Sequence, residues 1–172
     1  MRYRAIVPAG AVMLLAACAP RPAPESPSSG PTVSSVEVRV AQLDRVRTGP
    51  GAPELDREPA EIGADVTEAL ESALAPDPSG DVTVSVSLRG VELISRVEAA
   101  IPGAASRITG VVSAESAETG AEFLAPVEIT AGASAVSLPG VAGVVTAPDL
   151  EDDYEATVSG FASQVKRRLA AG

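Results

Sequence analysis

The clearest pattern along the chain is a helical stripe of large apolar residues near its C-terminal end. Acidic residues at 149–153 begin this segment and basic residues at 166–168 lie near its end, which complements the dipole of a helix. The apolar residues recur at intervals of three or four positions, the spacing of one helix face: Tyr154, Val158, Phe161, Val165 and Leu169. We therefore predict a final amphipathic helix whose apolar face contributes to the core.

A second helix is predicted between Pro59 and Pro76. Proline is favoured in the first turn of a helix and cannot continue one at its end. Gly63 should weaken this helix by up to about 1 kcal/mol relative to alanine. The segment before it, 42–57, is interrupted by glycine and proline and predicts a loop. The apolar face of the helix comprises Ile62, Val66, Leu70, Ala73 and Leu74.

Four segments alternate apolar and polar residues, which is the pattern of a half-buried β-strand. The first three lie at 33–40, from Val82 to about Val97, and at 108–115. In the second of them the apolar positions change parity across Arg89-Gly90. One extra residue in a strand has this effect and glycine tolerates it, so we predict a β-bulge there.

The fourth alternating segment follows a turn at 118–120, where Gly120 can adopt a positive φ. Pro126 has no N–H group to donate, so this strand should lie at an edge of the sheet or be bulged. The element order β-α-β-β-β-α predicts an α+β fold, a mainly antiparallel four-stranded sheet with two helices packed on one face. Alternation predicts these inward-facing residues in the last strand: Phe123, Ala125, Val127 and Ile129.

Composition and charge exclude several classes of function. The 172-residue chain has 13 Lys and Arg against 23 Asp and Glu, a net charge of −10, and it has no histidine. An acidic chain of this kind is a poor nucleic-acid binder, because phosphate backbones require clustered basic residues. Without histidine there is no imidazole acid or base, and the sequence has no P-loop, dinucleotide fingerprint or nucleophile elbow. We therefore expect no enzymatic activity, no catalytic residues and no cofactor.

Two acidic segments are candidate cation sites, and each has a simpler structural explanation. The segment Asp77-Pro78-Ser79-Gly80-Asp81 has some of the residues of a calcium loop, but it lacks the closing bidentate glutamate. Its composition is also typical of a plain turn. Glu151-Asp152-Asp153 lies in the first turn predicted for the last helix, where acidic residues are favoured. The sequence therefore predicts no metal site.

The N-terminal segment has the organisation of a secretory signal. Arg2 and Arg4 supply positive charge before an apolar run, 5–17, which is shorter than the about 20 residues that span a bilayer. The run closes with Leu15-Ala16-Ala17-Cys18, which resembles the lipobox of bacterial lipoproteins. The resemblance implies cleavage before Cys18, a diacylglycerol on its sulfur and a fatty acid on its new amino group. The alternative is an unmodified thiol after an ordinary signal peptide, although a lone free cysteine is a liability in a secreted chain.

The same resemblance implies where the protein is located. Ala19, rather than aspartate, follows the cysteine, which implies a lipid anchor in the outer membrane with the protein facing the periplasm. Proline and serine dominate the next residues and predict an extended tether on the order of 40 Å long. We thus expect a signal peptide at 1–17, the lipidated cysteine and tether at 18–32, and a single α+β domain at 33–172.

Residues 129–148 include no charged residue and contain valines and a leucine among glycines and prolines. Two interpretations are open. The segment is either an apolar loop that docks a protein partner or covers a ligand, or a loop that packs over the open end of the sheet. On the first interpretation, the contact residues would be Val136, Leu138, Val141, Val144 and Val145.

The order of elements after residue 32, with Ala117-Glu118-Thr119-Gly120 between two strands and a helix at the end, resembles small uncharacterised α+β lipoproteins of Gram-negative bacteria. In layout it is also similar to auxiliary lipoproteins of envelope transport systems, although only 2% of residues are aromatic. The resemblance implies a non-enzymatic lipoprotein that acts on a protein partner in the cell envelope, as an assembly or transport-auxiliary subunit. A small-molecule or lipid-binding lipoprotein, with 129–148 as a lid, is the alternative.

Overall fold

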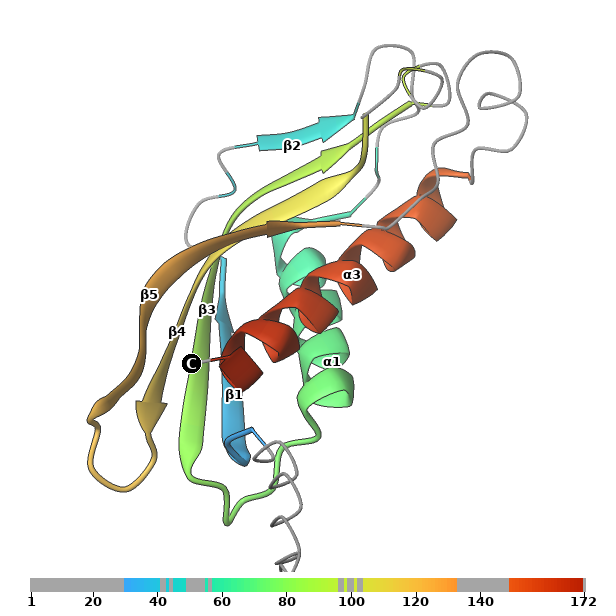
Figure 1. Ribbon diagram of the computed structural model, residues 1–172. Helices are drawn as coiled ribbons and strands as arrows, with labels where there is room; N and C mark the ends of the chain where they lie inside the picture. Colours follow the sequence, from blue (N-terminus) through green and yellow to red (C-terminus); the bar gives the residue numbers. More distant parts are fainter. Residues whose placement is uncertain are drawn as a thin grey trace, which may run out of the picture.

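The computed structural model describes residues 30–40, 43, 45–48, 55, 57–95, 98, 101, 104–132 and 149–171. A twisted sheet carries both long helices on one side (Figure 1). The predicted α+β fold and its element order are confirmed. In chain order, the elements are β1 (Val33–Arg39), β2 (Arg45–Thr48), α1 (Pro59–Leu74), β3 (Val82–Leu93), β4 (Arg107–Ser116), β5 (Glu122–Ala131) and α3 (Leu150–Ala171).

The sheet is organised around β3. The strand order is β1-β3-β4-β5, with β1 parallel to β3 and the other two pairings antiparallel. The short strand β2 also pairs with β3 in parallel, at residues 90–93, beyond the part that pairs with β1. The prediction of a loop throughout 42–57 is therefore wrong at 45–48, because the long strand β3 offers backbone partners that a local glycine and proline pattern does not reveal.

The predicted bulge in β3 is confirmed, because its pairing with β4 shifts register between Leu88 and Gly90. Even-numbered residues are buried before the shift, whereas Val91 and Leu93 are buried after it. The strand ends at Leu93 rather than near Val97. Just beyond it, the hydroxyl and backbone N–H of Ser95 both donate hydrogen bonds to the side chain of Glu98.

The last strand, β5, lies at an edge of the sheet, as Pro126 predicted. The predicted inward set is only partly right: Ile129 is buried and Val127 is half-buried, but Phe123 is 40% exposed and Ala125 is also exposed. Leu124 is buried in place of Phe123. The reason is that the pairing of β4 with β5 is irregular near Ala114, so strict alternation breaks at this end.

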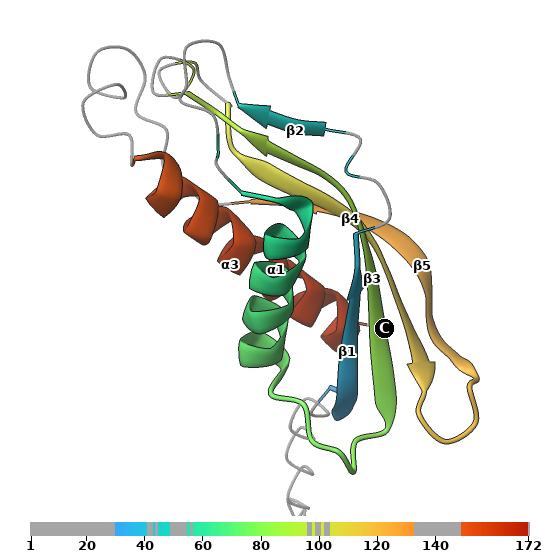
Figure 2. The ribbon, with the colours of Figure 1, turned by 180° about the vertical axis from the view of Figure 1, so that it is seen from behind.

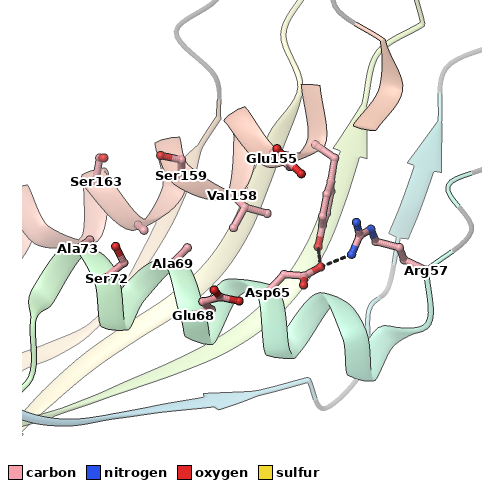
Figure 3. Close-up of a pocket in the computed structure, with 12 residues that line it drawn as sticks. Arg57, Asp65, Glu68, Ala69, Ser72, Ala73, Glu155, Val158, Ser159 and Ser163 are labelled. Carbon is pink, nitrogen blue, oxygen red and sulfur yellow. Dashed lines mark hydrogen bonds and ion pairs between the residues drawn. The ribbon is translucent and has the colours of Figure 1, made fainter. Parts of the chain in front are cut away.

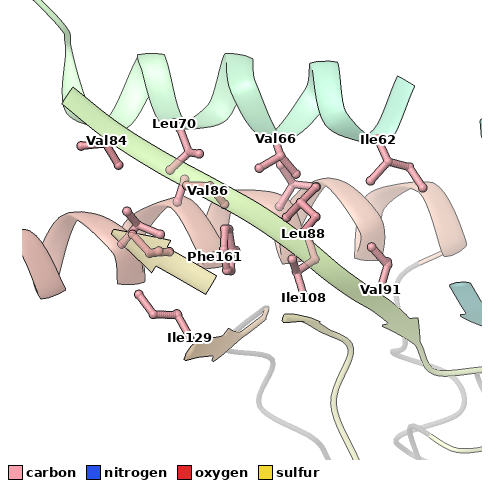
Figure 4. Close-up of a cluster of buried hydrophobic side chains, with 14 of the residues drawn as sticks. Ile62, Val66, Leu70, Val84, Val86, Leu88, Val91, Ile108, Ile129 and Phe161 are labelled. Atoms are coloured by element: carbon pink, nitrogen blue, oxygen red, sulfur yellow. The ribbon is translucent and has the colours of Figure 1, made fainter. Parts of the chain in front are cut away.

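The hydrophobic core lies between the sheet and the two helices (Figure 4). On the opposite face of the sheet the described residues place no helix, and this face presents hydroxyl side chains of β3, such as Thr83, Ser85 and Ser87, which are half-buried. All residues of the predicted α3 stripe are buried, which confirms it: Tyr154, Val158, Phe161, Val165 and Leu169.

Gly63 has a packing role that its helix propensity does not reveal. A Cβ atom at this position would lie 2.7 Å from Cγ2 of Val40, so a larger residue would force Val40 or the helix to shift, whereas glycine allows α1 to approach the end of β1 this closely. At its other end, α1 stops at Leu74 and Ala75 closes it in the left-handed conformation, with φ of 48°, just before Pro76. The helix packs against β1.

Candidate functional site: a groove between the two helices

A groove with a volume of about 550 Å³ lies between α1 and α3 and opens to solvent (Figure 3). Both helices contact each other along it. Its walls are formed by one face of each helix and by the residue that leads into α1. The lining residues are Arg57, Asp65, Glu68, Ala69, Ser72, Ala73, Tyr154, Glu155, Val158, Ser159, Ala162 and Ser163.

The groove exists because small residues line both helices with the same spacing. Three small residues of α1 and three of α3 recur at positions i, i+3 and i+4, which places each set on one helix face. Small side chains leave open space where leucines or phenylalanines would fill it. Sequence reasoning missed this site, although the repeated spacing was a usable signal: Ala69, Ser72 and Ala73 on α1, and Ser159, Ala162 and Ser163 on α3.

A polar cluster closes one end of the groove. Nη1 of Arg57 lies 2.7 Å from Oδ2 of Asp65, and the Tyr154 hydroxyl donates a hydrogen bond of 2.8 Å to the same oxygen. The other terminal nitrogen of Arg57 pairs with Glu151. The guanidinium carbon also lies 4.8 Å from the centre of the Tyr154 ring, within the range of a cation–π contact. These contacts join the segment before α1 to both helices.

The protonation states of Arg57 and Tyr154 favour a structural role for this cluster. The hydrogen bond with Glu151 raises the pKa of Arg57, so the guanidinium stays charged. Burial raises the pKa of Tyr154, and its hydrogen bond to Asp65 adds to that effect. The phenol is therefore a permanent donor near neutral pH, and neither group is suited to exchange protons with a substrate.

The groove as a whole favours cationic ligands. Glu68 and Glu155 are exposed on its two walls, and Asp65 and Glu151 lie at the closed end, where both pair with the guanidinium of Arg57. Because that guanidinium already bonds two of the carboxylates, the remaining charge is negative and attracts basic groups.

The candidate residues from the sequence fall in different places. Cys18 and the apolar set Val136, Leu138, Val141, Val144 and Val145 lie outside the described residues. Asp77 accepts hydrogen bonds from the backbone N–H and hydroxyl of Ser79, at 2.8 and 2.6 Å, which is the geometry of a plain turn. Asp153 is buried rather than solvated.

In the part of the chain that the structure describes, the acidic residues form no group of three or more that could hold a metal ion. Among the helices described, none combines the length and the apolar character needed to cross a bilayer.

Comparison with known proteins finds solved structures that are similar to this chain at low sequence identity. No family model matches the chain, and neither does a curated protein. A candidate lipoprotein from Caulobacter crescentus CB15 is 16% identical, with a TM-score of 0.38, over 79% of this chain and 88% of that one. A Xanthomonas campestris protein of the DUF330 family is 12% identical, with a TM-score of 0.41, over 84% and 86%. A functional proposal for this chain must therefore rest on its own residues.

Proposed function

We propose that this protein is a non-enzymatic lipoprotein, anchored in the outer membrane through Cys18, that binds a protein partner in the periplasm as an assembly or transport-auxiliary subunit. In this proposal residues 1–17 are the signal peptide, 18–32 form the lipidated tether, and 33–172 form the binding domain. The groove between α1 and α3 is the partner site. The observation that carries this assignment is an open groove with acidic walls and a floor of small residues.

The chemistry of the groove supports a basic protein segment as its occupant. Exposed Glu68 and Glu155 stand on opposite walls, where they can each pair with a lysine or arginine. The alanines on the floor let another backbone approach closely, and hydroxyls such as that of Ser159 can bond backbone groups. An acyl chain is a poorer fit, because these carboxylates and hydroxyls would lose water without gaining a polar partner.

The anchor is tested by metabolic labelling with palmitate. The wild-type chain should incorporate the label and sediment with outer-membrane vesicles on a density gradient, whereas Cys18→Ser should remain unlabelled and be released into the periplasmic fraction. One acyl chain binds a membrane only marginally and two or three bind stably, so the difference in fractionation should be large. Equal membrane association of both proteins would contradict the anchor.

The groove is tested by a photo-crosslinking amino acid placed at Ser159 in the full chain in cells. We expect one discrete protein adduct, which is lost when Glu68 and Glu155 are both replaced by lysine. The matched control is the same crosslinker at Thr130, which is exposed on β5 away from the groove and should give no such adduct.

The outcomes of this experiment separate the two candidate functions. A protein adduct that depends on the acidic walls supports the partner site. A lipid adduct at Ser159 would favour the lipid-binding alternative instead. No adduct at all, or an adduct unaffected by the charge reversals, would contradict the groove as a site for a basic segment.

A further inference from the structure

One edge of the sheet is built for pairing with another strand. β1 pairs with β3 on one side, and within the described residues no strand pairs with its other side (Figure 2). The opposite edge, β5, is interrupted by Pro126 and by register shifts, which hinder the addition of a strand. In contrast, residues 36–39 of β1 pair with β3 in unbroken register and include no proline.

The pattern of this edge is complementary to itself. Val36, Val38 and Val40 are half-buried and pack against the core, whereas Glu37 and Arg39 are exposed on the other face. If two such segments run antiparallel and are centred on Val38, valine lies opposite valine at each inward position. On the outward face, Glu37 of each copy then lies opposite Arg39 of the other.

We infer that β1 is an interface between two copies of this chain, which pair antiparallel about Val38 into one continuous sheet. The charges select this register. Centring the pair on Glu37 would place that glutamate opposite its own copy, and a parallel in-register pair would bring like charges together; both arrangements are unfavourable. An antiparallel pair centred between Glu37 and Val38 would place the inward-facing Val38 of one copy opposite the outward-facing Glu37 of the other.

The interface would complete packing that one copy leaves open. The three valines are only partly buried against the core, and within the described residues no strand pairs with the outer edge of β1. A second β1 would cover that side and form backbone hydrogen bonds along the edge. Within one copy, Arg39 and Glu37 already contact each other at 3.1 Å with both side chains mostly exposed, so both groups are available to a facing strand.

Charge reversal tests this inference on the full chain, by sedimentation equilibrium in a density-matched nonionic detergent. The wild type should form dimers. Glu37→Arg and Arg39→Glu should each raise the dimer dissociation constant at least about tenfold, because each places two like-charge pairs across the interface. The double variant Glu37→Arg/Arg39→Glu restores both opposite pairs and should return the constant to near its wild-type value. Glu128→Arg, an equivalent change on β5, should leave it unchanged.

Recovery in the double variant is decisive together with an unchanged fold in each single variant, because the Glu37–Arg39 pair within one copy is exposed and contributes little to folding. Circular dichroism of each variant should show the wild-type spectrum. The inference would be overturned if the wild type is monomeric or if neither single reversal raises the dimer dissociation constant. It would also be overturned if the double variant stays dissociated. Loss of the dimer in Glu128→Arg would overturn it as well, because it would place the interface on β5.

Discussion

Ser106→Ala should be among the most damaging small substitutions in this protein, because one buried hydroxyl satisfies two other groups. Ser106 is 2% exposed, and its Oγ accepts a 2.9 Å hydrogen bond from the backbone N–H of Ile94. The same hydroxyl donates to the carboxylate of Asp153, which is 7% exposed in the first turn of α3. No buried side-chain nitrogen or oxygen in the described residues lacks a hydrogen-bond partner. Ser106→Ala would remove the hydroxyl that donates to the buried carboxylate of Asp153.

The expected loss follows from the cost of leaving these groups unpaired. An unsatisfied buried group costs about 1–3 kcal/mol and a net hydrogen bond is worth about 1 kcal/mol, so Ser106→Ala should lower the free energy of unfolding by about 2–4 kcal/mol. A domain typically has only about 5–15 kcal/mol in total. The corresponding fall in Tm is roughly 10 °C, which a thermal melt followed by circular dichroism resolves easily.

The pH dependence of that loss identifies the carboxylate as its main source. Burial raises the pKa of Asp153, and the hydrogen bond from Ser106 counteracts part of that rise. Because the folded pKa exceeds the unfolded value of about 3.9, the native state binds more protons in this window and the free energy of unfolding falls as pH rises through it. Ser106→Ala raises the folded pKa further, so its deficit should be larger at pH 7 than at pH 4.

Two comparison variants make the test decisive. Ser113→Ala removes a half-buried hydroxyl from the uncovered sheet face and should change the free energy of unfolding by less than about 0.5 kcal/mol. Asp153→Asn keeps an acceptor for the Ser106 hydroxyl but cannot ionise, so it should retain stability and lose the pH dependence. The reasoning fails if Ser106→Ala matches Ser113→Ala in urea unfolding, or if its deficit is the same at pH 4 and pH 7.

Three other substitutions probe the fold and the groove. Gly132→Ala would place a Cβ atom 1.8 Å from the Ser106 carbonyl oxygen, so overpacking should cost about 1–3 kcal/mol in urea unfolding; a neutral result would contradict this contact. Phe161→Ala opens a cavity in the core and should cost about 3–5 kcal/mol by the same assay. Tyr154→Phe removes the donor to Asp65 and should cost about 1 kcal/mol without changing the far-ultraviolet spectrum.

Long periodic segments made most of the fold predictable from sequence. The α3 stripe spans four turns, and the valines before Arg89 alternate without interruption, so both elements and the bulge between Leu88 and Gly90 could be assigned. The predictions for short or ambiguous segments were wrong for physical reasons. Strand β2 has four residues and depends on β3 for its partners, and Phe123-Leu124 offers two consecutive apolar residues between which alternation alone does not choose.

The groove was harder to predict, because no single residue in it carries a chemical signature. Arg57 and Asp65 are separated from Glu151 and Tyr154 by more than eighty residues, and only the packing of α1 on α3 brings them together. Small residues such as Ala69 and Ser72 are also common on ordinary helix surfaces. Which helix faces meet is a tertiary property, and the sequence pattern assigned only the core-facing sides.

The placement of both helices on one face of the sheet has a consequence for any pair of copies joined through β1. An antiparallel pair in a continuous sheet is related by a two-fold axis perpendicular to that sheet, so the two helical layers stay on the same side. The two acidic grooves would then face in one direction. A partner with two basic segments, or an array of partners, could engage both at once, and the second contact would form at a high effective concentration. Weak individual grooves would thereby give durable binding.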